Sequence, residues 1–184
     1  QEMQMKKIIY VLSFILISQL TGCIVFHSVS YEVSVNEDGT GTALVTIDDL
    51  NTDATTKDMI DEDVKSILEY GLKSSEFVDG MKAEGKTITS RNVMVEREKL
   101  NAIIHYEFSD ISTVEGMLFD DPYYYLTIPV EDSIISTNGQ ITKTPEYQRI
   151  VWDKSIKTLK FKMFSDETSR EGLTSLAPYF LKEN

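Results

Sequence analysis

Short stretches in which apolar and polar residues alternate recur along the chain, and they constrain its fold more than any other feature. Tyr31–Val35 and Ala43–Ile47 alternate in this way, and Asp38-Gly39 between them supplies the positive-φ position that a tight turn requires. Residues 86–96 and 100–108 form a second, longer pair that turns near residue 98. An alternating strand buries one face and exposes the other. The sequence therefore predicts antiparallel hairpins.

More strands are predicted in the second half of the chain. Residues 133–137 and 140–143 flank Asn138-Gly139, a dipeptide typical of two-residue hairpin turns. We therefore expect these two segments to pair with each other. The remaining predicted strands cover residues 123–129, 149–153 and 158–163, and Trp152 in the second of them is expected to pack in the core.

Helices are predicted mainly in one block after the first hairpin. Thr55–Asp58 has the pattern of a capping box and precedes one apolar stripe at helical spacing. A second short helix should pass through Phe77 and end at Gly85, Ser112–Glu115 should cap a helical turn, and a last helix should pass through Phe180. The stripe consists of Ile60, Val64, Ile67, Leu68 and Leu72.

Together these elements predict an α+β fold in which an antiparallel β-sheet, built from hairpins, carries helices on one face. We find no linker-like composition after residue 28, so residues 29–184 are expected to form a single domain. A protein of this size can bury a core without disulfide bonds.

The N-terminal residues have the pattern of an export signal. Lys6-Lys7 precedes an apolar stretch, residues 8–20, that is too short to span a bilayer comfortably as a permanent helix. The stretch ends in Leu20-Thr21-Gly22-Cys23, which resembles the lipobox of bacterial lipoproteins. An uncleaved anchor with an incidental cysteine is the alternative. Residues 1–4 precede Met5 and are either an upstream start or not native.

The lipobox resemblance implies a location and a membrane attachment. In that family the cysteine, here Cys23, receives a diacylglyceryl group, and the signal, here residues 1–22, is removed. The protein would be exported and held to the cell envelope by acyl chains on Cys23, with residues 23–28 as a tether. An Asp at position 24 would resemble an inner-membrane retention signal. Ile24 therefore favours the periplasmic face of the outer membrane if the organism is Gram-negative.

The arrangement of hairpin, helix and hairpin behind a lipobox also resembles the LppM-type lipoprotein domain of mycobacteria. This resemblance covers about residues 29–110 and concerns layout rather than motif. It transfers no site residue to this protein.

Charge and composition exclude several classes of function. The protein has 30 acidic and 18 basic residues and a net charge of −12, so it would repel a phosphate backbone, and we expect no nucleic-acid partner. One cysteine excludes an internal disulfide bond. Two histidines, His27 and His105, leave little material for a metal site or for histidine-based catalysis. We expect no metal and no cofactor.

One segment combines carboxylates with aromatic rings. Asp120-Asp121 precedes Pro122 and three tyrosines, and such a set resembles sugar-binding clefts, where acids and aromatic platforms meet. The candidate ligand-binding residues are therefore Asp120, Asp121, Tyr123 and Tyr125. The alternative is an ordinary acidic turn followed by a strand.

Two other sets of polar residues are candidates for chemistry. His105 and Glu107 should share the more solvated face of their strand, but no nucleophile motif accompanies them. The acidic stretch 48–63 has the oxygen ligands that calcium prefers, although it departs from the EF-hand pattern at Ala54 and Ile60. Acids at a helix N-terminus are the simpler explanation for the acidic stretch.

These observations favour a non-catalytic, lipid-anchored envelope protein that presents an acidic domain to a protein partner. The alternative is a carrier that holds a lipid or another apolar molecule between the sheet and the Ile60–Leu72 helix. An enzyme acting on envelope polymers through Asp120 and Asp121 is a third hypothesis. An exposed apolar patch would favour the partner, an apolar cavity the carrier, and converging carboxylates the enzyme.

The lipobox prediction can be tested by one substitution. Cys23→Ala removes the sulfur that would carry the lipid, so the protein should move from the membrane fraction to the soluble fraction, because acyl chains rather than surface charge would hold it. Fractionation and immunoblotting measure this. A variant that stays in the membrane fraction would contradict the lipoprotein interpretation.

Overall fold

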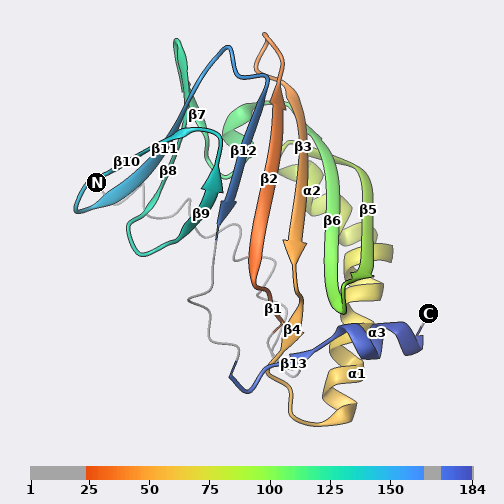
Figure 1. Cartoon of the computed structure of the whole chain (residues 1–184). Coiled ribbons are helices and arrows are strands. Elements are labelled where there is room, and N and C mark those ends of the chain that lie inside the picture. The colour runs from red at the N-terminus through yellow and green to blue at the C-terminus, as the bar shows by residue number, and fades with distance from the viewer. Residues whose placement is uncertain (1–23, 164–170, 184) are drawn as a thin grey trace.

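A computed structural model describes residues 24–163 and 171–183, and it shows an α+β fold built from three antiparallel sheets (Figure 1). The largest sheet has six strands, in the order β5 (Lys86–Glu96), β6 (Lys99–Phe108), β3 (Gly41–Asp48), β2 (Ser28–Val35), β12 (Thr158–Met163) and β9 (Ile134–Thr137). The second has four, in the order β10 (Gln140–Lys143), β11 (Tyr147–Asp153), β8 (Tyr123–Pro129) and β7 (Leu118–Asp120). A small third sheet joins β1 (Ile24–Val25), β4 (Asn51–Thr52) and β13 (Thr174–Ser175).

The helices lie between and after the strands. The first helix, α1 (Lys57–Ser66), continues directly into a π-helical segment, η3 (Ile67–Lys73). The others are α2 (Ser75–Ala83), a single 3₁₀ turn η4 (Ile111–Thr113) and α3 (Ala177–Glu183). The predicted fold class, antiparallel hairpins with helices packed against the strands, is confirmed.

Both predicted hairpins of the large sheet are present. Strands β2 and β3 pair in a register that places Tyr31 opposite Val45, and Gly39 has the positive φ, 84°, that its turn needs. Strands β5 and β6 turn through Arg97 and Glu98, which both have positive φ. Local alternation and turn chemistry are therefore enough to fix these four strands.

One face of the six-stranded sheet is covered by two different layers. At the β12 side, Phe161 and its neighbours pack against Leu126, Ile150 and Trp152 of the four-stranded sheet. At the β5–β6 side, α1 and α3 pack on the same face; this second core cluster consists of Leu50, Ala54, Ile60, Val64, Val93, Leu100, Leu176, Ala177 and Phe180. The opposite face carries the exposed residues of each strand.

The predicted apolar stripe is the buried face of α1 and η3. Ile60 and Val64 are buried, and the three later members of the stripe pack against the same cluster. The helix cap lies one residue later than predicted, because the hydroxyl of Thr56 rather than Thr55 accepts from the Met59 N–H. Helix α3 begins at Ala177, which puts Pro178 in the first turn, where its missing N–H costs nothing.

The predicted hairpin at Asn138-Gly139 is wrong. Strand β9 pairs with β12, whereas β10 pairs with β11, so this dipeptide leads from one sheet to the other. The side chain of Asn138 accepts from Trp152 Nε1 at 2.8 Å and from the Lys160 N–H at 2.8 Å. A Cβ on Gly139 would lie 2.7 Å from Trp152 Nε1, so close approach rather than turn geometry requires the glycine.

Two further predictions need correction. Residues 24–28 were expected in a tether, but Ile24–Val25 form β1, paired with β4, and Ser28 is fully buried. The predicted capping box at Ser112–Glu115 is absent from the described structure, because Asp110 caps the turn by accepting from the Ser112 N–H. Glu115 instead has a positive φ of 53° and turns toward the core.

Asn138 should be important for stability, because its side-chain oxygen accepts from the indole N–H of the fully buried Trp152 and from the backbone N–H of Lys160 on β12. Asn138→Ala leaves that N–H without a partner, and we expect the free energy of unfolding to fall by about 2–3 kcal/mol. Urea denaturation followed by Trp152 fluorescence measures this.

The matched control is Asn36→Ala, which removes a side-chain hydrogen bond in an exposed turn. It should cost less than about 1 kcal/mol. Equal losses in the two variants would contradict a special role for Asn138.

Candidate functional site

The outward face of the four-stranded sheet brings together tyrosines from two strands. Tyr125 is opposite Val151 on β11 and Leu118 on β7, and Tyr123 is opposite Asp153 and Asp120. Residues directly opposite in an antiparallel sheet share a face, as do residues two apart along a strand. We call this surface the tyrosine face; it consists of Leu118, Asp120, Tyr123, Tyr125, Thr127, Tyr147, Arg149, Val151 and Asp153.

Arg149 lies among the aromatic rings of this face. Its guanidinium carbon is 4.7 Å from the centre of the Tyr125 ring and 5.1 Å from that of Tyr147. Its Nε donates to Thr127 Oγ1 at 2.9 Å. Cation–π contacts and this hydrogen bond hold the side chain in one position. Arg149 is thus a cation that is fixed in place before any ligand arrives.

The predicted acidic pair does not act as a pair. Asp120 lies on the tyrosine face opposite Tyr123. Asp121 forms an ion pair with Lys154 at 2.5 Å, and the hydrogen bond between them holds the pKa of Lys154 above its ordinary value. Both acids are exposed, Asp120 as the last residue of β7 and Asp121 in the turn that follows it. Of the four candidate residues, the structure groups Asp120, Tyr123 and Tyr125 on one face and directs Asp121 elsewhere.

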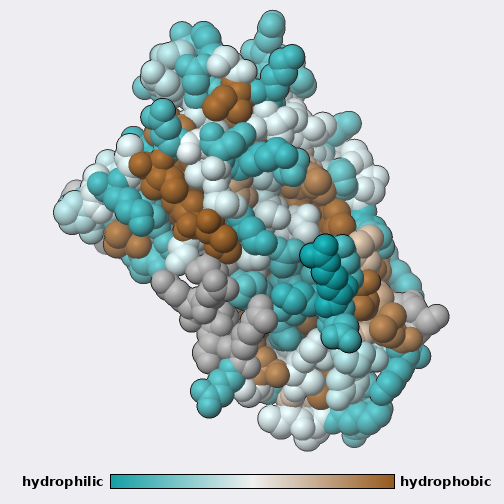
Figure 2. All heavy atoms as spheres, in the orientation of Figure 1, coloured by the Kyte–Doolittle hydropathy of each residue, from teal (hydrophilic) through white to brown (hydrophobic). Residues whose placement is uncertain are grey.

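Exposed apolar side chains gather around the same sheet. Leu118, Phe119 and Tyr123 are between 47% and 48% exposed, and the ring of Phe119 lies 4.7 Å from that of Tyr124. Figure 2 shows a band of apolar atoms on the left of the view, where Figure 1 places β9. Eight large apolar side chains in the described residues are exposed, and six of them lie between positions 118 and 141: Leu118, Phe119, Tyr123, Val130, Ile135 and Ile141.

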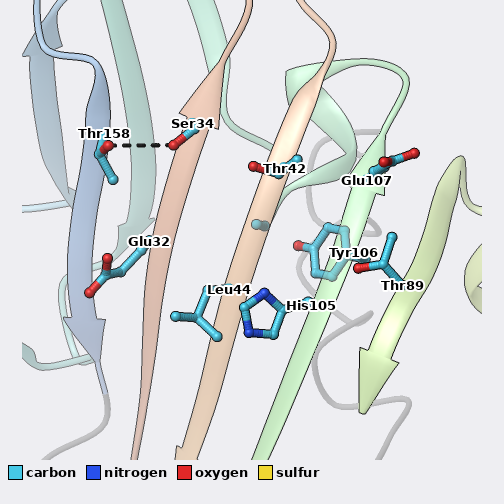
Figure 3. A pocket seen from close by; sticks show the side chains of 10 residues that line it. Glu32, Ser34, Thr42, Leu44, Thr89, His105, Tyr106, Glu107 and Thr158 are labelled. Carbon is cyan, nitrogen blue, oxygen red and sulfur yellow. Dashed lines mark hydrogen bonds between the residues drawn. The ribbon is translucent and has the colours of Figure 1, made fainter.

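His105 and Glu107 lie on the uncovered face of the six-stranded sheet, as predicted. They line a shallow, open depression of about 340 Å³ together with Glu32, Thr42 and Leu44 (Figure 3). The figure shows these side chains spread along neighbouring strands of the large sheet, from Thr158 on β12 to Thr89 on β5. His27, the second histidine, is half-buried, and its backbone N–H donates to the Asp48 carbonyl. It therefore does not lie in a solvated linker.

Several acids of residues 48–63 have separate structural partners. Asp48 accepts from Ser28 Oγ and pairs with Lys162, Asp49 pairs with Lys99, and Asp63 accepts from Thr52 inside the core. Within residues 24–163 and 171–183, no three His, Cys, Asp or Glu side chains converge as a metal site would require.

A carboxylate that sequence reasoning missed lies at the core. Glu115 Oε1 accepts from the hydroxyl of buried Tyr31 at 2.7 Å, close to Tyr106, Lys86 and Glu84. Burial raises the pKa of Glu115, while the Tyr31 hydrogen bond and the Lys86 charge partly oppose that change. Burial also raises the pKa of Tyr31. The signal that could have located Glu115 is its neighbour Gly116, since two consecutive residues of positive φ form this turn.

The lipobox residues Leu20, Thr21, Gly22 and Cys23 lie outside the described residues. The first described residue, Ile24, is already paired in the small sheet. In the described part of the protein, no helix has the length and apolar character needed to cross a bilayer.

No family model, curated protein or solved structure matches this sequence. The resemblances to the lipobox and to the LppM-type domain therefore depend on residues 5–23 and on the order of elements in residues 29–110.

Sequence reasoning found Tyr123 and Tyr125 but missed Arg149 and Tyr147. The first two alternate on one strand, which is visible as a local pattern. Arg149 joins them only through the register of β8 and β11, in which Thr127 is opposite Arg149. That register depends on pairing between segments about twenty residues apart, which no local pattern specifies.

Glu115 should make stability depend on pH. Its raised pKa means that the folded protein holds this proton more tightly than the unfolded protein does, whose carboxyl titrates near 4.3. Its contribution to stability is therefore complete below about pH 4.3 and is lost as pH rises through the raised value. Glu115→Gln retains an oxygen for Tyr31 and removes the titration. We expect its Tm to exceed that of the parent by a few degrees at pH 8, and by less at pH 4.

Thermal unfolding at several pH values tests this expectation. Glu107→Gln, on the uncovered face, is the matched control and should not change the pH profile. A Glu115→Gln profile parallel to that of the parent would show that the buried carboxyl does not titrate as described.

Proposed function

We propose that this protein is a non-catalytic, lipid-anchored envelope protein that binds a protein partner through the tyrosine face. The observation that carries this proposal is the presence of two half-exposed apolar side chains, Leu118 and Tyr123, beside Tyr125 on the tyrosine face. Phe119 is opposite Tyr124, so its exposed ring lies at the same edge of the sheet but on the other face. Water-exposed apolar side chains lower the free energy of an assembly when a partner covers them.

The residue types on this face support a protein partner. Tyrosine and arginine are enriched at the centres of protein interfaces, where they contribute much of the binding energy. Tyr123, Tyr125, Tyr147 and Arg149 lie on two strands whose backbones are hydrogen-bonded to each other within one four-stranded sheet. Little conformational entropy would be lost when they bind.

The position of β1 supports a particular orientation on the membrane. If Cys23 carries the acyl chains, the adjacent Ile24 holds the β1–β4–β13 end of the domain at the lipid surface. The β7–β8 turn lies at the other end of the molecule in Figure 1. Strand β2, which runs along this direction in Figure 1, has eight residues and is about 25 Å long. The tyrosine face would thus extend away from the headgroups, toward other envelope proteins.

The carrier and enzyme hypotheses have less support. A carrier would hold its ligand between the sheet and α1, but Ile60, Val64, Val93 and Leu100 are buried there in one packed cluster. An enzyme would need converging carboxylates, whereas Asp121 pairs with Lys154 away from the tyrosine face.

Site-specific cross-linking in cells tests the proposed surface. A benzophenone amino acid placed at Tyr123 in the full-length protein should give a discrete protein adduct on irradiation, because the probe would lie inside the interface. The same amino acid placed at His105, which is also exposed but lies on the uncovered face of the large sheet, should give little or none. Adducts are detected by immunoblotting and mass spectrometry.

Two results would contradict the proposal. Equal cross-linking at both positions, or none at Tyr123, would exclude the tyrosine face as a specific interface. Native mass spectrometry that reveals a bound lipid on the purified protein would favour the carrier instead.

A further inference from the structure

We infer that Arg149 determines which partner binds, by holding a carboxylate that the partner presents among apolar residues. The carboxylate would belong to an Asp or Glu side chain or to the partner's C-terminus. This inference rests on the proposed function, because it concerns the same face.

The guanidinium is arranged to receive a carboxylate. The rings of Tyr125 and Tyr147 lie at 4.7 and 5.1 Å from its central carbon, and Thr127 accepts only from Nε. Its two terminal nitrogens, Nη1 and Nη2, can then form the two parallel hydrogen bonds of a guanidinium–carboxylate pair. Because these contacts already restrict the side chain, less conformational entropy is lost when it binds a carboxylate.

The charges around Arg149 also favour an external carboxylate. The protein has 30 acidic and 18 basic residues, and lysines such as Lys154, Lys160 and Lys162 pair with its own acids. Among residues 24–163 and 171–183, no carboxylate lies within 4.0 Å of the Arg149 nitrogens. Within those residues, an acid-rich protein has therefore left this fixed cation without a counter-charge in contact with it.

The rest of the face fixes the direction in which an acidic partner can bind. Val151, Tyr125 and Leu118 form a neutral row beside Arg149, and Asp153 and Asp120 lie in the row beyond it. Arg149 and Asp153 are four residues apart on β11, which corresponds to about 13 Å. A carboxylate of the partner is attracted beside Arg149 and repelled beside Asp153 and Asp120. The partner should therefore present one acid, then apolar residues, and no acid at about 13 Å.

The test uses the full-length protein in its membrane, with the benzophenone probe at Tyr123. Arg149→Glu should reduce the photo-adduct at least tenfold, because like charges would then meet, and Arg149→Gln should reduce it less. Both variants should keep the Tm of the parent, since the guanidinium lies outside both core clusters.

A carbodiimide identifies the group that Arg149 touches. This reagent joins an amine to a contacting carboxylate as an amide, with loss of water and without a spacer. The Arg149→Lys variant should give an amide-linked adduct whose partner peptide is joined through Asp, Glu or its C-terminus. Thr42→Lys, which places an exposed lysine on the uncovered face of the large sheet, should give none.

The outcomes separate this inference from the proposed function. A photo-adduct that forms normally in Arg149→Glu, with no amide in Arg149→Lys, would overturn the inference and leave the interaction surface intact. Absence of any photo-adduct at Tyr123 in the parent protein would overturn both. An amide adduct in Arg149→Lys but not in Thr42→Lys, together with loss of the photo-adduct in Arg149→Glu, would support the inference.

Discussion

The rest of the structure depends on an aromatic contact between the two large sheets. Phe161 lies against Tyr31 within the six-stranded sheet, with ring centres 4.7 Å apart, and against Trp152 of the four-stranded sheet, at 5.8 Å. Such pairs add stabilisation beyond the burial of apolar area. Trp152 can lie at this interface because Asn138 satisfies its indole N–H, and Tyr31 can do so because Glu115 accepts from its hydroxyl. The buried side of the four-stranded sheet is thereby fixed, and its outward side becomes a rigid platform.

This arrangement gives the domain two exposed sheet faces of different character. The uncovered face of the six-stranded sheet is polar, with charged side chains paired to one another, as in Lys160–Glu32 and Lys162–Asp48. The outward face of the four-stranded sheet instead has aromatic rings and one fixed cation. Paired charges are well solvated and gain little from a partner, whereas apolar rings gain from being covered. The contrast between the two faces is the physical basis for assigning the interaction to the smaller sheet.

Sequence reasoning was correct for features that neighbouring residues specify, and it failed for features that depend on pairing between distant segments. The β2–β3 and β5–β6 hairpins, the Ile60–Leu72 stripe and the buried position of Trp152 come from patterns within a few residues, and all are confirmed. Asn138-Gly139 has the local pattern of a hairpin turn, but long-range pairing of β9 with β12 overrides it. Ser112–Glu115 resembles a capping box, yet Asp110 takes that role. The tyrosines of β8 could be predicted as a set, whereas their association with Arg149 depends on strand register.

The pairing of β2 with β12 has a consequence for how the protein reaches this fold. Tyr31 is opposite Phe161, so the centre of the large sheet closes only after a segment 161 − 31 = 130 residues further along the polypeptide has been synthesised. Contacts between such distant segments are slow to form. Until β12 pairs with it, β2 has one unpaired backbone edge, and its apolar residues Val29, Tyr31 and Val33 are incompletely covered. Such open edges are sites of aggregation. Pairing with β12 therefore does more than complete the sheet: it removes the open edge of the first long strand and so protects that strand from association with other polypeptides.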